Sequence, residues 1–402
     1  MNLALKVLHI SKSDSGGAGN AALRLHKAMV DQGIDSKMLC LQMSKKEITS
    51  VIKFSDSLLK KTIRSTRLPF NKYVKHNRLL KKRGGNYESF SFIESDYLIH
   101  RHKLVREANI INLHFINGFV DYKTFFENVH KPIFWTLHDM NPFMGGFHYQ
   151  EDLKRNKENL GDIEDYLQNE KITIYKQCRD LSIVSLNRWM FELARHSEHF
   201  SDRSNFIIPN TIDFATFNIY DKFAQRERFG LPTDKVILMF VSFNSGNYRK
   251  GGDILLNTTK EVKARDVIYC QIGRSAASQQ SNNLILNLGH FSNEDDLARL
   301  YSAVDAVILP SREDNLPNVL LESLACGTPV ISTPVGGCLD VIDHGFNGLF
   351  TKNVSSESLA ETIDDFVSRH ESFNRDAIRA KAFEKFSPVI IVKKYLEAYG
   401  ER

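Results

Sequence analysis

Short apolar runs alternate with amphipathic segments along most of the chain. The runs suited to buried parallel strands cover residues 6–11, 110–114, 132–138, 182–186, 235–243, 267–272, 304–309 and 328–333. Between several of these runs, apolar positions recur every three or four residues, as they do along one face of a helix. This alternation predicts an α/β protein with two doubly wound parallel sheets, one in each half of the chain.

The most informative segment covers residues 304–350. An apolar strand ends at Pro310, a polar loop follows, and Pro317 suits the first turn of the next helix, where no backbone N–H is needed. Asp314 lies in the loop and Glu322 lies on the helix. Both carboxylates are therefore expected at the carboxyl end of a parallel strand, a place where α/β proteins bind nucleotides.

The chemistry of this position suits a nucleotide. Free backbone N–H groups at a helix N-terminus favour a diphosphate, and a carboxylate such as Glu322 offers only acceptors, which suits a ribose diol. The alternative is that Asp314 and Glu322 are ordinary acidic residues near a helix start, favoured by the helix dipole. Periodicity alone leaves both interpretations open.

Three further features carry polar or basic groups next to predicted strands. Gly16, Gly17 and Gly19 form a turn after the first strand, and such a turn lets the backbone approach a phosphate or a sugar. His138 ends the strand at 132–138, where capping the strand end is the simpler interpretation, and His114 is a weaker candidate of the same kind. The third feature is the pair Arg249 and Lys250, for which the alternative interpretation is a solvated basic turn.

Together these motifs resemble family 4 of the GT-B glycosyltransferases, whose C-terminal signature is roughly S-x-x-E-G-F-P-x-x-x-x-E-A-x-A-x-G-x-P-V. The matching residues are Ser311, Pro317, Glu322, Ala325, Gly327, Pro329 and Val330. Asp314 stands where the first glutamate is expected, and Asn244 stands where the family usually has an arginine. The segments SREDNLPN and WTLHDMNPFMGGFHY are similar to a polysaccharide-biosynthesis branch that includes colanic acid transferases.

The resemblance implies a GT-B fold, in which two Rossmann-like domains face a central cleft. It implies an acceptor-side domain at 1–205, a nucleotide-sugar domain at 206–382 and a C-terminal helix at 383–402 that returns to the first domain. At the reacting centre it implies roles for His138, Asp314 and Lys250. For the nucleotide-sugar it implies contacts from Gly16, Gly17, Arg249, Lys250, Gly273, Asn315, Leu316 and Glu322. Neither a metal nor another cofactor is expected.

The activity implied is retaining transfer of a sugar from a UDP- or GDP-sugar to a lipid-linked or oligosaccharide acceptor, in cell-surface polysaccharide biosynthesis. One alternative is an isomerase of the nucleotide-sugar 2-epimerase type, which would change the sugar without an acceptor. Another is a non-catalytic binding subunit, because Asp314 and Asn244 depart from the family pattern.

The distribution of charge along the chain bears on where the protein is located. The 402 residues carry a net charge of +5, and residues 53–83 hold eleven Lys or Arg and one acidic residue. Such a stretch can lie on an anionic membrane, with each basic residue contributing about 1 kcal/mol, or it can be a solvated face. Nucleic acid is not expected as a partner, since no nucleic-acid module accompanies the stretch.

The remaining features indicate the compartment. The five cysteines are scattered and odd in number, as in reduced core residues. The N-terminus has no signal-peptide core. We therefore expect a cytoplasmic protein that lies on the inner face of the plasma membrane where the basic stretch binds. The acidic stretch 150–170 is interpreted as an insert or lid, because it breaks the alternation of strands and helices.

Overall fold

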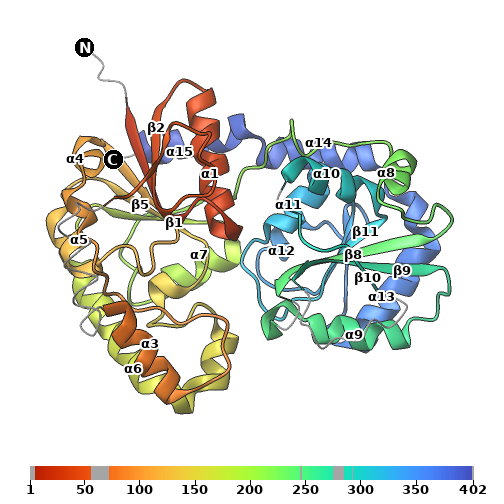
Figure 1. Ribbon diagram of the computed structural model, residues 1–402, viewed down its shortest axis with the longest axis horizontal. Coiled ribbons are helices and arrows are strands. Elements are labelled where there is room, and N and C mark those ends of the chain that lie inside the picture. The colour runs from red at the N-terminus through yellow and green to blue at the C-terminus, as the bar shows by residue number, and fades with distance from the viewer. Residues whose placement is uncertain (1–4, 56–71, 245–246, 275–284, 292, 401–402) are drawn as a thin grey trace. The chain divides into compact units, whose positions relative to one another are not determined.

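The computed structural model describes residues 5–55, 72–244, 247–274, 285–291 and 293–400. The chain divides into two compact units, the first made of residues 1–209 and 392–402 and the second of residues 210–391. Each unit has one parallel sheet with helices packed against it (Figure 1). The expectation of two doubly wound sheets is therefore confirmed.

The first unit contains a seven-stranded sheet of order β3-β2-β1-β4-β5-β6-β7. Its strands are β1 (Lys6–Ser13), β2 (Asp35–Gln42), β3 (Val51–Lys53), β4 (Ile110–Leu113), β5 (Ile133–Leu137), β6 (Leu181–Ser185) and β7 (Asn205–Ile207). All neighbouring pairs are parallel. The strands β4, β5 and β6 are buried along their whole length, which is why they read as continuous apolar runs. The strand order reverses between β1 and β4.

Helices connect and cover this sheet. They are α1 (Gly16–Asp31), α3 (Lys72–Arg83), α4 (Lys103–Glu107), α5 (Tyr122–Asn128), α6 (Gln150–Gln177), α7 (Arg188–Arg195) and α15 (Pro388–Gly400). The last helix docks on the central strands, since the hydroxyl of Tyr395 lies 3.0 Å from that of Thr136. The side chain of Asn112 also donates to the hydroxyl of Tyr399. None of the described helices is long and apolar enough to cross a membrane.

The acidic stretch 150–170 does not break the alternation, so its interpretation as an insert or lid is wrong. It lies in α6, the helix that connects β5 to β6. Its polar side chains are partly internal: the Glu164 carboxylate accepts three backbone N–H bonds from residues 145–147. The Lys171 ammonium donates to three backbone carbonyls of residues 141–145. This helix therefore braces the loop that follows β5.

The second unit contains a six-stranded parallel sheet of order β10-β9-β8-β11-β12-β13. Its strands are β8 (Val236–Asn244), β9 (Val267–Arg274), β10 (Ile285–Asn287), β11 (Ala306–Leu309), β12 (Val330–Ser332) and β13 (Gly348–Phe350). The helices are α8 (Lys222–Arg228), α9 (Gly252–Glu261), α10 (Glu294–Ala303), α11 (Asn318–Ala325), α12 (Cys338–Val341), α13 (Ser356–Arg369) and α14 (Arg375–Phe386). Here the strand order reverses between β8 and β11. All five cysteines of the chain are buried and free, in agreement with the expectation of reduced core residues.

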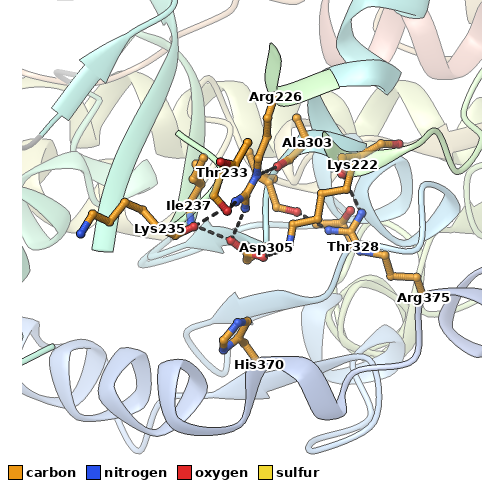
Figure 2. A network of polar contacts seen from close by, with 12 residues as sticks. Lys222, Arg226, Thr233, Lys235, Ile237, Ala303, Asp305, Thr328, His370 and Arg375 are labelled. Atoms are coloured by element: carbon orange, nitrogen blue, oxygen red, sulfur yellow. Dashed lines mark hydrogen bonds and ion pairs between the residues drawn. The ribbon is translucent and has the colours of Figure 1, made fainter. Parts of the chain in front are cut away.

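Asp305 fixes the amino end of β11 through a buried ion-pair network (Figure 2). Its carboxylate pairs with Lys222 and lies 2.6 Å from Nη2 of Arg226, and it accepts a 2.7 Å bond from the backbone N–H of Ile237. Burial raises the pKa of Asp305, but the bonds from Lys222 and Ile237 and the charge of Arg226 outweigh burial and hold it below its ordinary value. The network lies at the opposite edge of the sheet from the strands' carboxyl ends.

Candidate functional site

The carboxyl ends of β8 and β11 carry the predicted basic and acidic residues of the second unit. A short 3-10 helix (Tyr248–Lys250) follows β8, and the loop 310–317 follows β11. These two strands are neighbours and the strand order reverses between them. Such a reversal point is where open α/β sheets bind their ligands, because the loops on its two sides diverge.

Asp314 is the centre of the contacts at this edge. Its carboxylate lies 3.2 Å from Nη1 of Arg249 and 2.5 Å from Nζ of Lys250. Arg249 also donates a 2.9 Å bond to the backbone carbonyl of Glu313. The Ser311 hydroxyl donates to the same carboxylate at 3.3 Å. Three residues predicted separately are thus brought into direct contact.

The electrostatics of this cluster keep Asp314 ionised. Its burial alone would raise the pKa of the carboxyl. The charges of Lys250 and Arg249 and their hydrogen bonds overcome burial, so that the pKa of Asp314 is held below its ordinary value. The side chain of Lys250 is 28% exposed, whereas those of Asp314 and Arg249 are almost fully buried. Lys250 is therefore the member of the cluster that an anion can approach.

Two glycines hold the loop after β11 in place by close backbone contact. A Cβ on Gly251 would lie 1.9 Å from the carbonyl oxygen of Pro310, and one on Gly336 would lie 1.6 Å from that of Asp314. Both glycines have a positive φ, of 68° and 50°. Any larger residue at either position would push the loop away, so the position of Asp314 depends on both.

The other predicted residues of the second unit lie around this cluster. Asn315 and Leu316 are buried in the same loop. Glu322 lies on α11, where its carboxylate accepts a 2.9 Å bond from the hydroxyl of Tyr301 on α10. Gly273 lies near the end of β9, and its N–H donates to Gly289 rather than to any member of the cluster. The structure thus brings Arg249, Lys250 and Asp314 together.

In the first unit, the predicted glycine turn opens α1. Gly16 begins the helix with a φ of 76°, and Gly17 follows it. Gly19 is needed for packing, since a Cβ there would lie 2.6 Å from the carbonyl oxygen of Ser13. Asp14 ties this turn to the loop after β2 by accepting bonds from the backbone of Ser44 and Lys45.

His138 lies directly after β5, at the end of a chain of three imidazoles. Its Nε2 lies 3.0 Å from Nδ1 of His114, and Nε2 of His114 lies 3.0 Å from Nδ1 of His9. Burial lowers the pKa of His138 to about 4, and it also holds the pKa values of His114 and His9 well below their usual range. All three rings are therefore neutral at neutral pH.

The sequence did not point to two residues that contact the predicted ones. His9 lies inside β1, and the available signal was a histidine in an otherwise apolar strand. Tyr301 had no such signal, because an aromatic residue on a helix is usually part of the core. The Asn244 side chain and the basic residues between 56 and 71 lie outside the described residues.

Part of the second unit is similar to a known protein family. Residues 221–383 match the family described as Glycosyl transferases group 1. A D-inositol 3-phosphate glycosyltransferase of Thermobispora bispora is 28% identical over 220 residues, which cover 48% of this chain and 50% of that protein. An uncharacterized glycosyltransferase of Methanocaldococcus jannaschii is 27% identical, over 57% of this chain and 62% of its own length. The chain spans about half the length of the first of these relatives.

Solved structures extend the likeness to the whole chain. Anabaena HepE in complex with UDP and glucose matches with a TM-score of 0.69 at 16% identity, over 99% of this chain and all of that one. WaaG, a glycosyltransferase involved in lipopolysaccharide biosynthesis, matches with a TM-score of 0.62 at 14% identity, over 96% and 98%. The chain therefore has the GT-B fold of two parallel-sheet domains, and its residues 221–383 are similar to the group 1 glycosyltransferase family.

Proposed function

We propose that this protein is a retaining glycosyltransferase that transfers a sugar from a UDP- or GDP-sugar to a lipid-linked or oligosaccharide acceptor. The observation that carries the proposal is the contact of Arg249, Lys250 and Asp314 at the reversal point of the second sheet. This cluster lies inside the region that matches the group 1 family. It offers positive charge at the edge of the sheet where a diphosphate would bind.

The charges of the cluster suit the breaking of a sugar–phosphate bond. As that bond breaks, negative charge develops on the leaving diphosphate and positive charge on the sugar ring. Lys250 and Arg249 stabilise the diphosphate. Fixed charges of this kind lower the activation barrier by several kcal/mol, roughly 3–4 for one hydrogen-bond donor. Asp314 holds both cations in place. Because its carboxylate is buried between them, we give it this role rather than direct contact with the sugar.

Roles are also proposed for Glu322 of the second unit and for His138 of the first unit. Glu322 accepts hydrogen bonds from the ribose diol, and the hydroxyl of Tyr301 orients its carboxylate. His138 contacts the donor sugar through the part of its ring that remains accessible. The acceptor hydroxyl attacks from the face that the diphosphate leaves, and a leaving phosphate oxygen takes its proton, so that the anomeric configuration is retained.

The structure of the basic stretch supports a membrane-bound acceptor. The described part of the stretch includes α3, whose last turn carries Lys81, Lys82 and Arg83. The helix contains no buried residue, and the contact of Arg83 with Asp162 ties it to α6. An exposed basic helix binds anionic lipid through its charge. We propose that the enzyme works at the inner face of the plasma membrane in cell-surface polysaccharide synthesis.

The first experiment measures thermal unfolding with saturating UDP and, separately, GDP. A ligand at a hundred times its dissociation constant should add about 2.7 kcal/mol of stability. We expect a shift with one nucleotide, and UDP is the first choice because the similar HepE structure holds UDP and glucose. The matching sugar nucleotide is then incubated with and without a lipid-linked saccharide, and the sugar is followed. No shift with either nucleotide, together with no release of nucleotide from any donor, would contradict the proposal.

A further inference from the structure

The three histidines of the first unit come from three adjacent strands. His9 lies in β1, His114 follows β4, and His138 follows β5, and these strands are neighbours in the order β1-β4-β5. The ring centroids are 5.3 Å apart for His9 and His114 and 5.2 Å apart for His114 and His138. Residues 105 and 24 apart in sequence thus form one continuous chain of nitrogen–nitrogen hydrogen bonds.

The solvent exposure of the three histidine rings differs along this chain of hydrogen bonds. His9 is fully buried and His114 is 3% exposed, whereas His138 is partly exposed. Within the described part of the protein, Nδ1 of His138 is left for a substrate, because its only hydrogen bond is made by Nε2. The chain therefore leads from the core to one accessible nitrogen.

Only two arrangements of the protons satisfy both bonds. Each ring is neutral, so it has one N–H and one bare nitrogen. If His9 donates to His114, then His114 donates to His138, and the remaining proton of His138 lies on Nδ1. If all the bonds run the other way, His138 donates to His114, and Nδ1 of His138 is a bare acceptor.

The inner end of the chain decides between the two arrangements. Nε2 of His9 is buried and has no hydrogen-bond partner among the described residues. In the second arrangement this nitrogen would carry a buried N–H without an acceptor, and such orphaned N–H groups are rarer than unpaired acceptors. The first arrangement leaves only a lone pair unsatisfied and is therefore the more stable.

We propose that His9 and His114 are positioning residues, which hold His138 in the tautomer whose Nδ1 carries the proton. A hydrogen bond to one ring nitrogen fixes the state of the other. His138 then presents a hydrogen-bond donor to the substrate, and that nitrogen does not serve as a base. The inference deepens the proposed function at the same site, since its effect on turnover rests on the transferase activity, but the tautomer itself does not.

The test is nitrogen NMR of the full chain labelled with ¹⁵N-histidine, in which the shifts of the two ring nitrogens report the tautomer. The resonances of His138 are identified by their loss in H138Q. We expect the proton of His138 on Nδ1 throughout the neutral range in the wild type. Finding it on Nε2 would overturn the proposal, whatever the activity of the protein.

Variants of the chain give the second readout. H114L removes the bonds of His114 to His9 and to His138, so His138 should move toward the Nε2-protonated tautomer. H114N should restore the wild-type tautomer, because the asparagine amide can donate to His138 from about the position of Nδ1. H26N is the matched control: His26 is buried and its ring lies 5.9 Å from that of His9, but it bonds to Ser36 and Ser50. We expect no tautomer change in H26N. An unchanged tautomer in H114L would also overturn the proposal, and if that variant does not fold, the wild-type spectrum decides alone.

Kinetics separate this inference from the proposed function. In H114L, kcat for the sugar donor should fall by about tenfold, the worth of one hydrogen bond, while the affinity for UDP alone stays unchanged. In H114N, kcat should recover. Lack of turnover in the wild type with every donor would count against the transferase, whereas the tautomer measurement would still stand.

Discussion

The ammonium of Lys250 lies 2.5 Å from the carboxylate of Asp314, and only the lysine is accessible. Because Asp314 is buried between Lys250 and Arg249, its removal takes a charge partner away from a buried guanidinium. We predict that Asp314→Asn lowers the free energy of unfolding by about 3–5 kcal/mol and weakens UDP binding. Urea unfolding and calorimetric titration of UDP measure the two effects.

An exposed ion pair of the same unit is the control for this change. Asp365 pairs with Arg369 at 2.7 Å, and its side chain is 51% exposed. We expect Asp365→Asn to cost less than about 1 kcal/mol, since solvent screens such pairs, and to leave UDP binding unchanged. Equal effects of the two substitutions would contradict the role given to Asp314.

Lys250 should contribute to turnover more than to folding. The Lys250→Ala variant loses the accessible charge at the leaving diphosphate, and we predict a fall in kcat of about 10²–10³-fold. The loss of stability should be smaller than in Asp314→Asn, because Arg249 still pairs with the carboxylate. Lys352→Ala is a suitable control, because Lys352 is also paired, 2.9 Å from Glu361, on an exposed surface. Near-normal turnover in Lys250→Ala would remove the cluster from the mechanism.

Glu322 should be required for the nucleoside part of the donor. We predict that Glu322→Ala abolishes most donor turnover and weakens UDP binding, because the ribose hydroxyls lose their acceptor. Tyr301→Phe, which removes only the 2.9 Å bond to Glu322, should have a smaller effect in the same direction. Competition of UDP with deoxyuridine diphosphates identifies the ribose hydroxyl that is bound. If Glu322→Ala preferred UDP over these analogues as strongly as the wild type does, Glu322 would not be the acceptor of the ribose hydroxyls.

The close contact at Gly336 can be separated from its backbone conformation. Gly336 and Gly230 both have a positive φ, of 50° and 63°, but a Cβ on Gly230 would meet no atom within 4 Å. Gly230→Ala should therefore cost only the backbone term, about 1–2 kcal/mol. Gly336→Ala should cost about 1–3 kcal/mol more and should also weaken UDP binding, because it displaces the loop that carries Asp314.

Asp305 should make stability depend on pH in the acidic range. Its folded pKa lies below the unfolded value of about 3.9, so its contribution is fully present above that value and is lost as the pH falls through the folded pKa. We predict that Asp305→Asn destabilises the protein by about 3–5 kcal/mol at pH 7. The gap from the wild type should close as the pH falls below about 3.9, as measured by urea unfolding.

Asp266 provides the comparison for Asp305. It pairs with Lys235 at 2.5 Å, but the pair is exposed to solvent. Asp266→Asn should therefore leave the unfolding curve unchanged at both pH values. If the difference in unfolding free energy between wild type and Asp305→Asn stayed constant as the pH falls, the charge of Asp305 would not be the cause of the destabilisation.

The sequence predicted the parts of the fold whose hydrophobic pattern is local. The start of the helix α11 was expected at Pro317, and the helix runs from Asn318 to Ala325, because a proline marks its beginning. The stretch 150–170 was misread because a buried charge such as Glu164, like that of Lys171 directly after the stretch, looks solvated in a sequence. Their partners are backbone groups of a loop, which leave no pattern of residue types.

The sequence predicted Arg249, Lys250 and Asp314 as candidates, but it did not predict the contacts between them. Arg249 and Asp314 were found in two different motifs, and only the pairing of β8 with β11 brings them together. The contact of His9 with His114 depends in the same way on the pairing of β1 with β4, and the sequence did not point to His9 at all. Register between distant strands is a property of the whole sheet, which a local pattern cannot specify.

The docking of α15 on the first sheet means that this unit is built from both ends of the chain. A fragment that stops at Pro209 would lack Tyr395 and Tyr399, and it would leave Thr136 and Asn112 without their hydroxyl partners. Anyone who separates the two halves to study nucleotide binding should therefore excise 210–391 and keep the C-terminal segment with the N-terminal one. All seven strands of the first sheet are synthesised before residue 210, but the helix that packs on its central strands is synthesised only after the second unit.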